Sequence, residues 1–309
     1  MRVLNVGSIR CFLLKDGTFQ YPKATLDSEQ TRAIFGDLPD EVPIPYTAML
    51  LDNGTQRVLL DTGAGPLGPF TGRLQSQIHE AGYTPDLIDM VFITHAHADH
   101  IGGLLNEDGR FAYPNARLLM AQAEWEFWLS LSLSGKLGTG QLMGIPPLED
   151  LMHQWLKRYL FPLADRVELL DGEREISRGV NAFAAPGHTP GHMGVALASG
   201  GEQALYVADA FLLPEQVKCP EWSLIFDTDR PTLVNTRRQI LDRASADRCR
   251  VIAFHFPSDG FVSQQGNDFT WEPHTRVKKL QATEKHSLQP SSFWSNSLFF
   301  QLVIGQQDE

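Results

Sequence analysis

Four potential metal ligands lie within six consecutive residues, in an H-x-H-x-D-H arrangement. Directly after the apolar run 89–93 come His95, His97, Asp99 and His100. Neutral imidazole offers a nitrogen lone pair and carboxylate an anionic oxygen, so this cluster suits Zn²⁺ or another first-row divalent ion. In an extended segment the first two histidines point to one side, and the aspartate and last histidine can face the other once the chain turns. The spacing predicts a pocket for two ions; the alternative is a polar surface loop whose histidines only titrate.

Other candidate ligands stand where later apolar runs end. His188 lies between two Pro/Gly turns in the segment 185–192, where the backbone is stiff. Asp209 and His255 each follow a short apolar run. A strand fixes the position of such a side chain, and the loop beyond it gives access. A lone aspartate after a strand is more often a turn residue or a helix cap, but the shared context makes these residues a set.

The order of these motifs resembles that of the metallo-β-lactamase superfamily of binuclear hydrolases. The chain reads H-x-H-x-D-H, then G-H-T-P-G-H, then one apolar run ending in Asp and another ending in His. The earlier stretch 57–65 resembles the superfamily's strand that ends in D-T-G, so the resemblance spans residues 57 to 255. It implies two ions that share one bridging aspartate, Asp209. One ion would be held by His95, His97 and His188, and the other by Asp99, His100 and His255.

Two residues are expected to support these ligands without binding an ion. The resemblance implies that Asp61 hydrogen-bonds a ligand imidazole and fixes its tautomer; the alternative is a turn residue before Thr-Gly. His192 repeats the Pro-Gly-His pattern after His188, but no ligand position is left for it, so we expect a hydrogen-bonded or structural residue. The remaining histidines are interpreted as surface residues: His79, His153, His274 and His286.

Composition favours one enzyme domain. The ligands are spread over most of the 309 residues, so we expect a single hydrolase domain over 1–275 and an extension over 276–309. The net charge of −11 opposes nucleic-acid phosphates. No apolar stretch predicts a signal peptide or a membrane span, so a cytoplasmic protein with no membrane partner is expected. Three distant cysteines argue against a disulfide framework, and none is near the histidine cluster: Cys11, Cys219 and Cys249.

Periodicity predicts alternating strands and helices. Strands are expected at 2–6, 9–14, 46–52, 56–61, 89–94, 116–121, 166–170, 180–185, 193–198, 203–208 and 250–254. Helices are expected at 71–82, 122–132, 148–160 and 230–245. The resemblance implies an α/β (α+β) fold, the four-layer αβ/βα sandwich, with the metal site at one edge between two sheets. The Gly/Pro-rich stretch 135–147 is either a mobile loop near the site or a surface connection.

The C-terminal stretch is polar as far as Pro290 and then becomes apolar over 293–304. Such a segment combines β-propensity, apolarity and low charge, and it should not remain in water. It either packs on its own domain or completes a homodimer interface.

Two bound ions would supply hydrolytic chemistry. A hydroxide bridging them is a nucleophile at neutral pH, because metal binding lowers the pKa of water from about 15.7 to roughly 7. Asp209 would hold both ions, and Asp99, at the second ion and close to the leaving group, is the candidate proton shuttle. We therefore expect cleavage of an ester, lactone or phosphotriester of a small apolar substrate. Zinc is the first choice of metal, and manganese, cobalt and iron accept the same ligands.

The substrate pocket is predicted from apolar residues near the ligands. Trp125 and Trp128 are candidates for its wall, although a helix burying both in the core is an equal alternative. The segments 124–128 and 208–238 resemble the branch that contains methyl parathion hydrolase and N-acyl homoserine lactone lactonases. Those lactonases place a tyrosine three residues beyond the bridging aspartate, whereas this chain has Leu212. The difference favours an ester or organophosphate-like leaving group, with Phe211 and Leu212 extending an apolar wall.

Three other classes share the motif or the fold. A glyoxalase II-like thioesterase would need a glutathione-binding helical domain, and the final stretch is short for one. A persulfide-type dioxygenase would use a single iron and fewer ligands. A non-catalytic metal-binding module on the same fold would be expected to lose ligands, and none is missing here.

Overall fold

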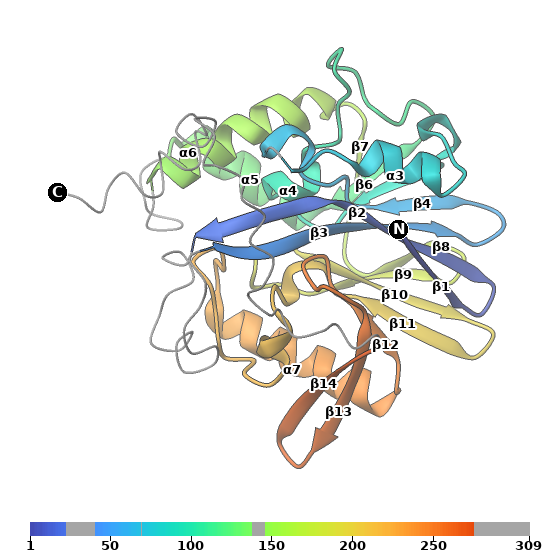
Figure 1. The fold of residues 1–309 in the computed structure, drawn as a ribbon. Helices are drawn as coiled ribbons and strands as arrows, with labels where there is room; N and C mark the ends of the chain where they lie inside the picture. The colour runs from blue at the N-terminus through green and yellow to red at the C-terminus, as the bar shows by residue number, and fades with distance from the viewer. Residues whose placement is uncertain (23–40, 69, 138–145, 275–309) are drawn as a thin grey trace, which may run out of the picture.

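Two seven-stranded sheets form the centre of the molecule (Figure 1). The computed structural model describes residues 1–22, 41–68, 70–137 and 146–274. The first sheet follows chain order: β1 (Arg2–Val6), β2 (Ile9–Pro22), β3 (Glu41–Asp52), β4 (Arg57–Leu60), β5 (Met90–Ile93), β6 (Arg117–Ala121) and β7 (Val167–Leu170). The second runs in reverse chain order from β14 (Asp268–Pro273) through β13 (Gly260–Gln265), β12 (Arg250–Ile252), β11 (Glu202–Tyr206), β10 (Met193–Ser199) and β9 (Val180–Ala184) to β8 (Arg174–Ser177).

Helices cover the outer face of each sheet, which makes four layers. Beside the first sheet lie α3 (Leu74–Glu80), α4 (Ala98–Ile101), α5 (Gln122–Ser134) and α6 (Pro146–Trp155). The second sheet is covered by α7 (Arg230–Ala246), at the opposite side of the molecule in Figure 1. This arrangement confirms the expected αβ/βα sandwich. No helix in the described ranges is both long enough and apolar enough to cross a bilayer.

The middle of the second sheet, at β10 and β11, is apolar on both faces because each face meets a different layer. In β11, Ala204 and Tyr206 belong to the core between the sheets, whereas Leu205 packs in the core beneath α7. Alternate residues of a strand point to opposite faces, so three consecutive buried residues serve two cores. In the first sheet all four residues of β5 are buried, as expected for a parallel strand covered on both sides.

The predicted strands and helices are present, with differences at several ends. β2 and β3 are longer than predicted because they pair well beyond the apolar stretches, across a bulge between Lys15 and Gly17. Four elements had no clear signal in the sequence because they are short or mostly polar: α4, β8, β13 and β14. Of the stretch 135–147, α6 already begins at Pro146 and residues 138–145 lie outside the described ranges. The proposed C-terminal extension, 276–309, also lies outside them.

Parallel pairing brings the candidate site together. β4, β5 and β6 are parallel neighbours in the first sheet, and β11 and β12 are parallel neighbours in the second. The carboxyl ends of parallel strands meet at one sheet edge, which is where open α/β sheets place their ligands. The residues that follow β4, β5, β11 and β12 therefore face one another between the two sheets.

Candidate metal centre

The H-x-H-x-D-H cluster spans the turn that follows β5 and the first residues of α4. The chain leaves β5 at Ile93, and His97 immediately precedes the first residue of α4. The helix then carries Asp99 and His100 toward the second sheet. His95 and His100 are completely buried and His97 is 6% exposed, whereas the side chain of Asp99 is 13% exposed. This position leaves Asp99 accessible from the pocket.

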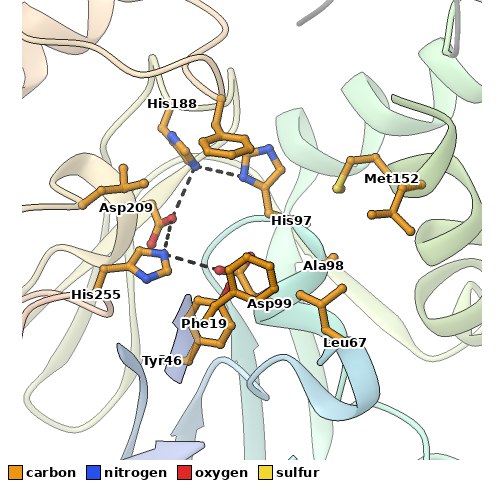
Figure 2. Close-up of a pocket in the computed structure, with 13 residues that line it drawn as sticks. Phe19, Tyr46, Leu67, His97, Ala98, Asp99, Met152, His188, Asp209 and His255 are labelled. Carbon is orange, nitrogen blue, oxygen red and sulfur yellow. Dashed lines mark hydrogen bonds and ion pairs between the residues drawn. The ribbon is translucent and has the colours of Figure 1, made fainter. Parts of the chain in front are cut away.

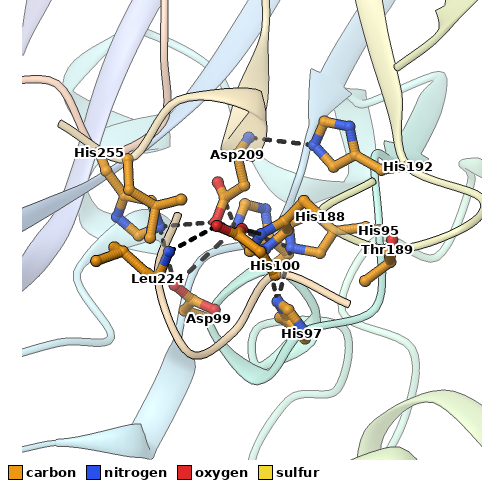
Figure 3. A network of polar contacts seen from close by, with 12 residues as sticks. His95, His97, Asp99, His100, His188, Thr189, His192, Asp209, Leu224 and His255 are labelled. Carbon is orange, nitrogen blue, oxygen red and sulfur yellow. Dashed lines mark hydrogen bonds and ion pairs between the residues drawn. The ribbon is translucent and has the colours of Figure 1, made fainter. Parts of the chain in front are cut away.

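Three histidines bring one nitrogen each to a common point (Figure 3). The Nδ1 atom of His97 lies 3.1 Å from Nε2 of His95 and 2.9 Å from Nε2 of His188. A single ring hydrogen can serve only one of these two contacts, so the three nitrogens cannot satisfy one another. A divalent ion can accept all three lone pairs, so this group fits a metal.

A second group lies directly beside the first. His255 Nε2 is 3.0 Å from Asp209 Oδ2 and 3.4 Å from Asp99 Oδ2. His100 Nε2 is 3.2 Å from Asp209 Oδ1, yet both atoms are buried without a well-directed hydrogen bond. Buried polar atoms left in this state are costly unless an ion or water joins them. The group therefore has the residue types of a second metal site, and two of its donor atoms lack a hydrogen-bond partner within the described residues.

Asp209 lies between the two groups. Its Oδ2 atom is also 3.5 Å from His188 Nε2 and 3.9 Å from His95 Nε2. The residue follows β11 in a single turn over Ala208–Ala210, at the position predicted from the apolar run. One carboxylate thus contacts histidines of both groups, which is the arrangement a bridging ligand requires.

Burial and the carboxylates act on the histidines in opposite directions. Burial lowers the pKa of His95 and His97 well below the usual value, and neighbouring histidines lower it further. Burial alone would do the same to His100, but the carboxylates around it, Asp209 first, raise its pKa well above the usual value. Asp209 also raises the pKa of His255. In return these two histidines outweigh the burial of Asp209 and hold its pKa well below the usual range.

The outer nitrogens of three rings have partners that orient them. His188 Nδ1 donates to Asp227 Oδ1 at 2.8 Å, and His255 Nδ1 donates to the carbonyl of Pro45 at 3.1 Å. His100 Nδ1 lies 3.0 Å from Asp61 Oδ2. The contacts of His188 and His255 would hold the ring hydrogen on Nδ1 when an ion is bound, so that Nε2 is free to present its lone pair to the centre. The structure thus places Asp61 against a candidate ligand, and it adds Asp227, which the sequence analysis missed.

His192 lies behind the centre and contacts it through the backbone. Its Nδ1 donates to the carbonyl of Ala185 at 2.9 Å, and its Nε2 accepts from the backbone N–H of Asp209 at 3.1 Å (Figure 3). Complete burial lowers the pKa of His192 to about 3. The neutral ring therefore holds the backbone at Asp209.

An apolar pocket opens onto the centre (Figure 2). Its floor includes His97, Asp99, His188, Asp209 and His255. Its wall comes from separate segments of both halves: Phe19, Tyr46, Leu67, Ala98, Leu151, Met152, Leu212 and Phe226. Of the described chain, α6 and the segment before α7 thus supply wall residues that no sequence motif indicated.

Only one of the four predicted wall residues lines this pocket. Leu212 does so. Trp128 is instead buried behind His97, with the two ring centres 5.7 Å apart, and Trp125 packs against Phe161. Phe211 belongs to the core beneath α7. The aromatic cluster on α5 thus takes the core position that the sequence analysis gave as its alternative.

The remaining histidines and the cysteines lie elsewhere. His79 and His274 are exposed, His153 is half-buried and contacts Ser132, and His286 lies outside the described ranges. Neither metal group includes a cysteine, and all three cysteines are free thiols.

Comparison with known proteins identifies the family. The sequence profile of the metallo-beta-lactamase superfamily matches residues 42–255, more than half of the chain, so the protein belongs to that superfamily. An N-acyl homoserine lactonase from Bacillus sp is 24% identical over 177 residues, which are 51% of this chain and 58% of that protein. The N-acyl homoserine lactonase AiiA of Bacillus thuringiensis subsp. kurstaki is 22% identical over 169 residues, 48% of this chain and 56% of its own length. The match thus spans little more than half of these curated relatives.

Solved structures share the whole fold at low identity. The hydrolase AbOPH, of the beta lactamase superfamily, has a TM-score of 0.78 and 24% identity, with 89% of this chain and 97% of that one covered. AidC, a dizinc quorum-quenching lactonase in complex with a product, has a TM-score of 0.75 and 23% identity, with 89% and 98% covered. At these identities the likeness establishes the fold, and the residues of the site must indicate the chemistry.

Proposed function

We propose that the protein is a metal-dependent hydrolase that holds two divalent ions and cleaves an ester or lactone of a small, partly apolar molecule. The observation that carries this proposal is the pair of adjacent ligand groups, joined by Asp209, at the floor of an apolar pocket. Zinc is the first choice, since three imidazoles form one group and imidazoles with carboxylates the other. Manganese, cobalt and iron accept the same donors.

Seven residues would hold the ions: His95, His97 and His188 on one side, Asp99, His100 and His255 on the other, and Asp209 between them. When bound, such ions supply a nucleophilic water at neutral pH and polarise the carbonyl under attack. The protein's part is to fix the donors and to keep other water away. Burial of the histidines restricts their movement, and the apolar wall of the pocket disfavours additional water.

Asp99 is the residue placed to move a proton. It lines the pocket and is the most exposed member of its group. In ester hydrolysis a bond forms between carbonyl carbon and water oxygen, the bond to the leaving oxygen breaks, and that oxygen needs a proton. Asp99 can take the proton from the attacking water and deliver it to the leaving oxygen. Asp209 is enclosed by histidines and serves as a ligand.

The apolar wall suggests an acyl chain or an aromatic ring in the substrate. Burial of one methylene group contributes about 0.8 kcal/mol, or roughly a fourfold gain in affinity. Leu212 supplies no hydroxyl at the position where the lactonases carry a tyrosine. We therefore expect an aryl ester to be a better substrate than a lactone, and a phosphotriester with an aryl leaving group to be accepted as well.

Steady-state kinetics of the zinc-loaded protein test this function. The measurement is kcat/KM for an aryl ester, a long-chain N-acyl homoserine lactone and methyl parathion, with His97→Ala and Asp209→Ala as matched inactive variants. We expect the aryl ester to be cleaved faster than the lactone and each variant to lose at least about 100-fold, beyond the effect of removing a partner of a ligand. Lactone preference would show that another group replaces the missing tyrosine. Wild-type turnover by zinc-loaded Asp209→Ala would contradict the two-metal proposal.

A non-catalytic module on this fold is the second candidate. No feature of the described residues favours this non-catalytic role, because both candidate ligand groups have at least three members and contribute residues to the lining of the pocket. Absence of turnover on all three substrates, with two zinc ions bound, would favour it. A glyoxalase II-like thioesterase would be indicated by hydrolysis of a glutathione thioester above that of the aryl ester.

A further inference from the structure

Glu124, in the first turn of α5, is a fully buried carboxylate with four hydrogen-bond donors. Oε1 accepts from the backbone N–H of Ala96 at 2.9 Å and from Nε1 of Trp128 at 2.7 Å. Oε2 accepts from Oγ1 of Thr189 at 2.6 Å and from the backbone N–H of Gly191 at 3.1 Å. An ionised carboxylate only accepts hydrogen bonds, so these four donors match its capacity.

Three of the four donors to Glu124 lie on the two loops that carry the three-histidine group. Ala96 stands between His95 and His97, and Thr189 directly follows His188. One loop follows β5 and the other lies between β9 and β10. The backbone N–H of Met193, at the start of β10, donates to the carbonyl of Thr94 at 3.0 Å, and Glu124 adds further contacts between the two loops. The carboxylate therefore spans the two loops next to all three histidines.

The helix and the second loop are in close backbone contact at this point. A Cβ atom added to Gly191 would lie 2.0 Å from the backbone nitrogen of Glu124 and 2.4 Å from its Cα. Side chains cannot approach backbone so closely, so only glycine permits this distance. Trp128 closes the other side, with its indole against the ring of His97. Glu124 thus has little freedom to move away from its donors.

We propose that Glu124 is a positioning residue that sets the separation of the two loops and thereby the geometry of the His95, His97 and His188 site. It touches neither the pocket nor the ligand atoms, and it acts through the backbone on either side of them. The inference rests on the proposed metal function. It predicts that loss of the carboxylate weakens one metal site and leaves the other intact, because no donor to Glu124 belongs to Asp99, His100 or His255.

Glu124→Gln is the sharpest variant. The amide keeps the size of the side chain but replaces one acceptor oxygen by an NH₂ group. In either orientation that group faces a backbone N–H, of Ala96 or of Gly191, and a buried donor facing a donor is destabilising. Asp16→Asn is the matched control: Asp16 is also a buried carboxylate that accepts from backbone N–H groups, those of Ala64, Gly72 and Leu74.

The experiment is calorimetric titration of the metal-free full-length protein with zinc, with kcat/KM at saturating zinc as a second readout. For wild type we expect two binding events. For Glu124→Gln we expect one to weaken by about 10–100-fold and the other to change by less than threefold, with activity recovering as zinc is raised. Asp16→Asn is expected to lose stability and keep both zinc affinities.

Two results would overturn the inference: both zinc affinities of Glu124→Gln within threefold of wild type, or equal weakening by Asp16→Asn. Wild-type protein that binds no zinc would overturn the proposed function itself, which is a distinct result. If Glu124→Gln does not fold, the variant Thr189→Val tests the inference instead. It removes one hydrogen-bond donor to Glu124, and valine has nearly the same shape as threonine. It is expected to weaken the same zinc event several-fold, and unchanged affinity would contradict the proposal.

Discussion

At the scale of single residues, the candidate ligands differ in what holds their outer nitrogen. His255 is held by a backbone carbonyl, whereas His188 is held by the carboxylate of Asp227. That carboxylate is itself fixed, since its second oxygen accepts from the backbone N–H of Leu224 at 2.8 Å and lies 3.8 Å from the buried guanidinium of Arg237. A buried charged partner increases the basicity of the imidazole and sets its orientation.

Asp227→Asn should therefore lower zinc affinity and kcat/KM by about 10–100-fold. Either orientation of the new amide places an NH₂ group against a donor, from His188 Nδ1 or from the N–H of Leu224. Zinc titration and steady-state kinetics give the measurement. Asp242→Asn, on the exposed face of α7, is the control and should match wild type. An Asp227→Asn protein with wild-type zinc affinity would show that His188 needs no such partner.

His192 should make the metal-free protein sensitive to acid. Its pKa is about 3 in the folded state, against about 6.5 when unfolded, so protons bind the unfolded chain more readily. Its stabilising contribution is complete above pH 6.5 and is lost as the pH falls toward 3, by up to about 1.4 kcal/mol per pH unit. Urea unfolding between pH 7.5 and 4.5 should show this loss, and His192→Gln should show a smaller one.

The comparison with His192→Gln is needed because other histidines also titrate. His95 and His97 act in the same direction as His192, whereas the raised pKa of His100 and His255 adds stability at low pH that is lost as the pH rises. The difference between wild type and variant isolates His192. Equal pH slopes for the two proteins would contradict a buried neutral ring at this position.

At the scale of elements, the loop 185–192 is held between two helices. Gly191 contacts the first turn of α5, and a Cβ at Gly187 would lie 2.3 Å from the backbone nitrogen of Leu233 in α7. The carbonyl of Gly187 also accepts from the N–H of Asp229, which caps α7. Two glycines thus allow helices of opposite layers to approach one loop of the centre.

Gly191→Ala should destabilise the protein by about 1–3 kcal/mol, as expected when volume is forced into a packed contact. The new Cβ would meet backbone, which cannot move as a flexible side chain can. Gly68→Ala is the control, since its Cβ would have only ordinary contacts, the nearest at 3.7 Å, and the change in free energy should be under about 0.5 kcal/mol. Urea unfolding of both variants gives the measurement, and equal stabilities would exclude the close contact at Gly191.

The sequence predicted the ligand-bearing ends of the strands because those signals are local. An apolar run followed by His or Asp indicates both a buried strand and a polar group at its end, as at Asp209 and His255. The wall of the pocket had no such signal, since Phe19, Met152 and Phe226 come from separate segments that meet only in the fold. Asp227 likewise lies 39 residues from His188. Glu124 had one local signal, its spacing of four residues from the buried Trp128, which places both on one helical face.

At the scale of the whole molecule, the candidate ligands divide between the two sheets. The H-x-H-x-D-H cluster follows β5 of the first sheet, whereas Asp209 and His255 follow β11 and β12 of the second, and His188 precedes β10. Bound ions would therefore connect the halves of the sandwich. Anything that binds only the folded state also stabilises it by mass action.

Removal of zinc by a chelator should lower the thermal midpoint by several degrees. At a free zinc concentration of 100 times Kd, each site contributes about 2.7 kcal/mol. Differential scanning calorimetry of loaded and chelated protein gives the measurement, and added zinc should restore the midpoint. The doubly substituted protein His97→Ala, His255→Ala should respond much less. A midpoint unaffected by chelation in wild type would mean that no ion is held at the centre.

The separation of the ligands along the chain also imposes an order in time during protein synthesis. At roughly 5–20 residues per second, His255 leaves the ribosome roughly 8 to 30 seconds after His100. β12 pairs in parallel with β11 only after α7 has been made, so the second sheet closes late. Until then the nascent chain carries the H-x-H-x-D-H cluster without its partners. The complete set of candidate ligands therefore exists only once His255 has been made, and an ion held by all of them would be acquired after that point.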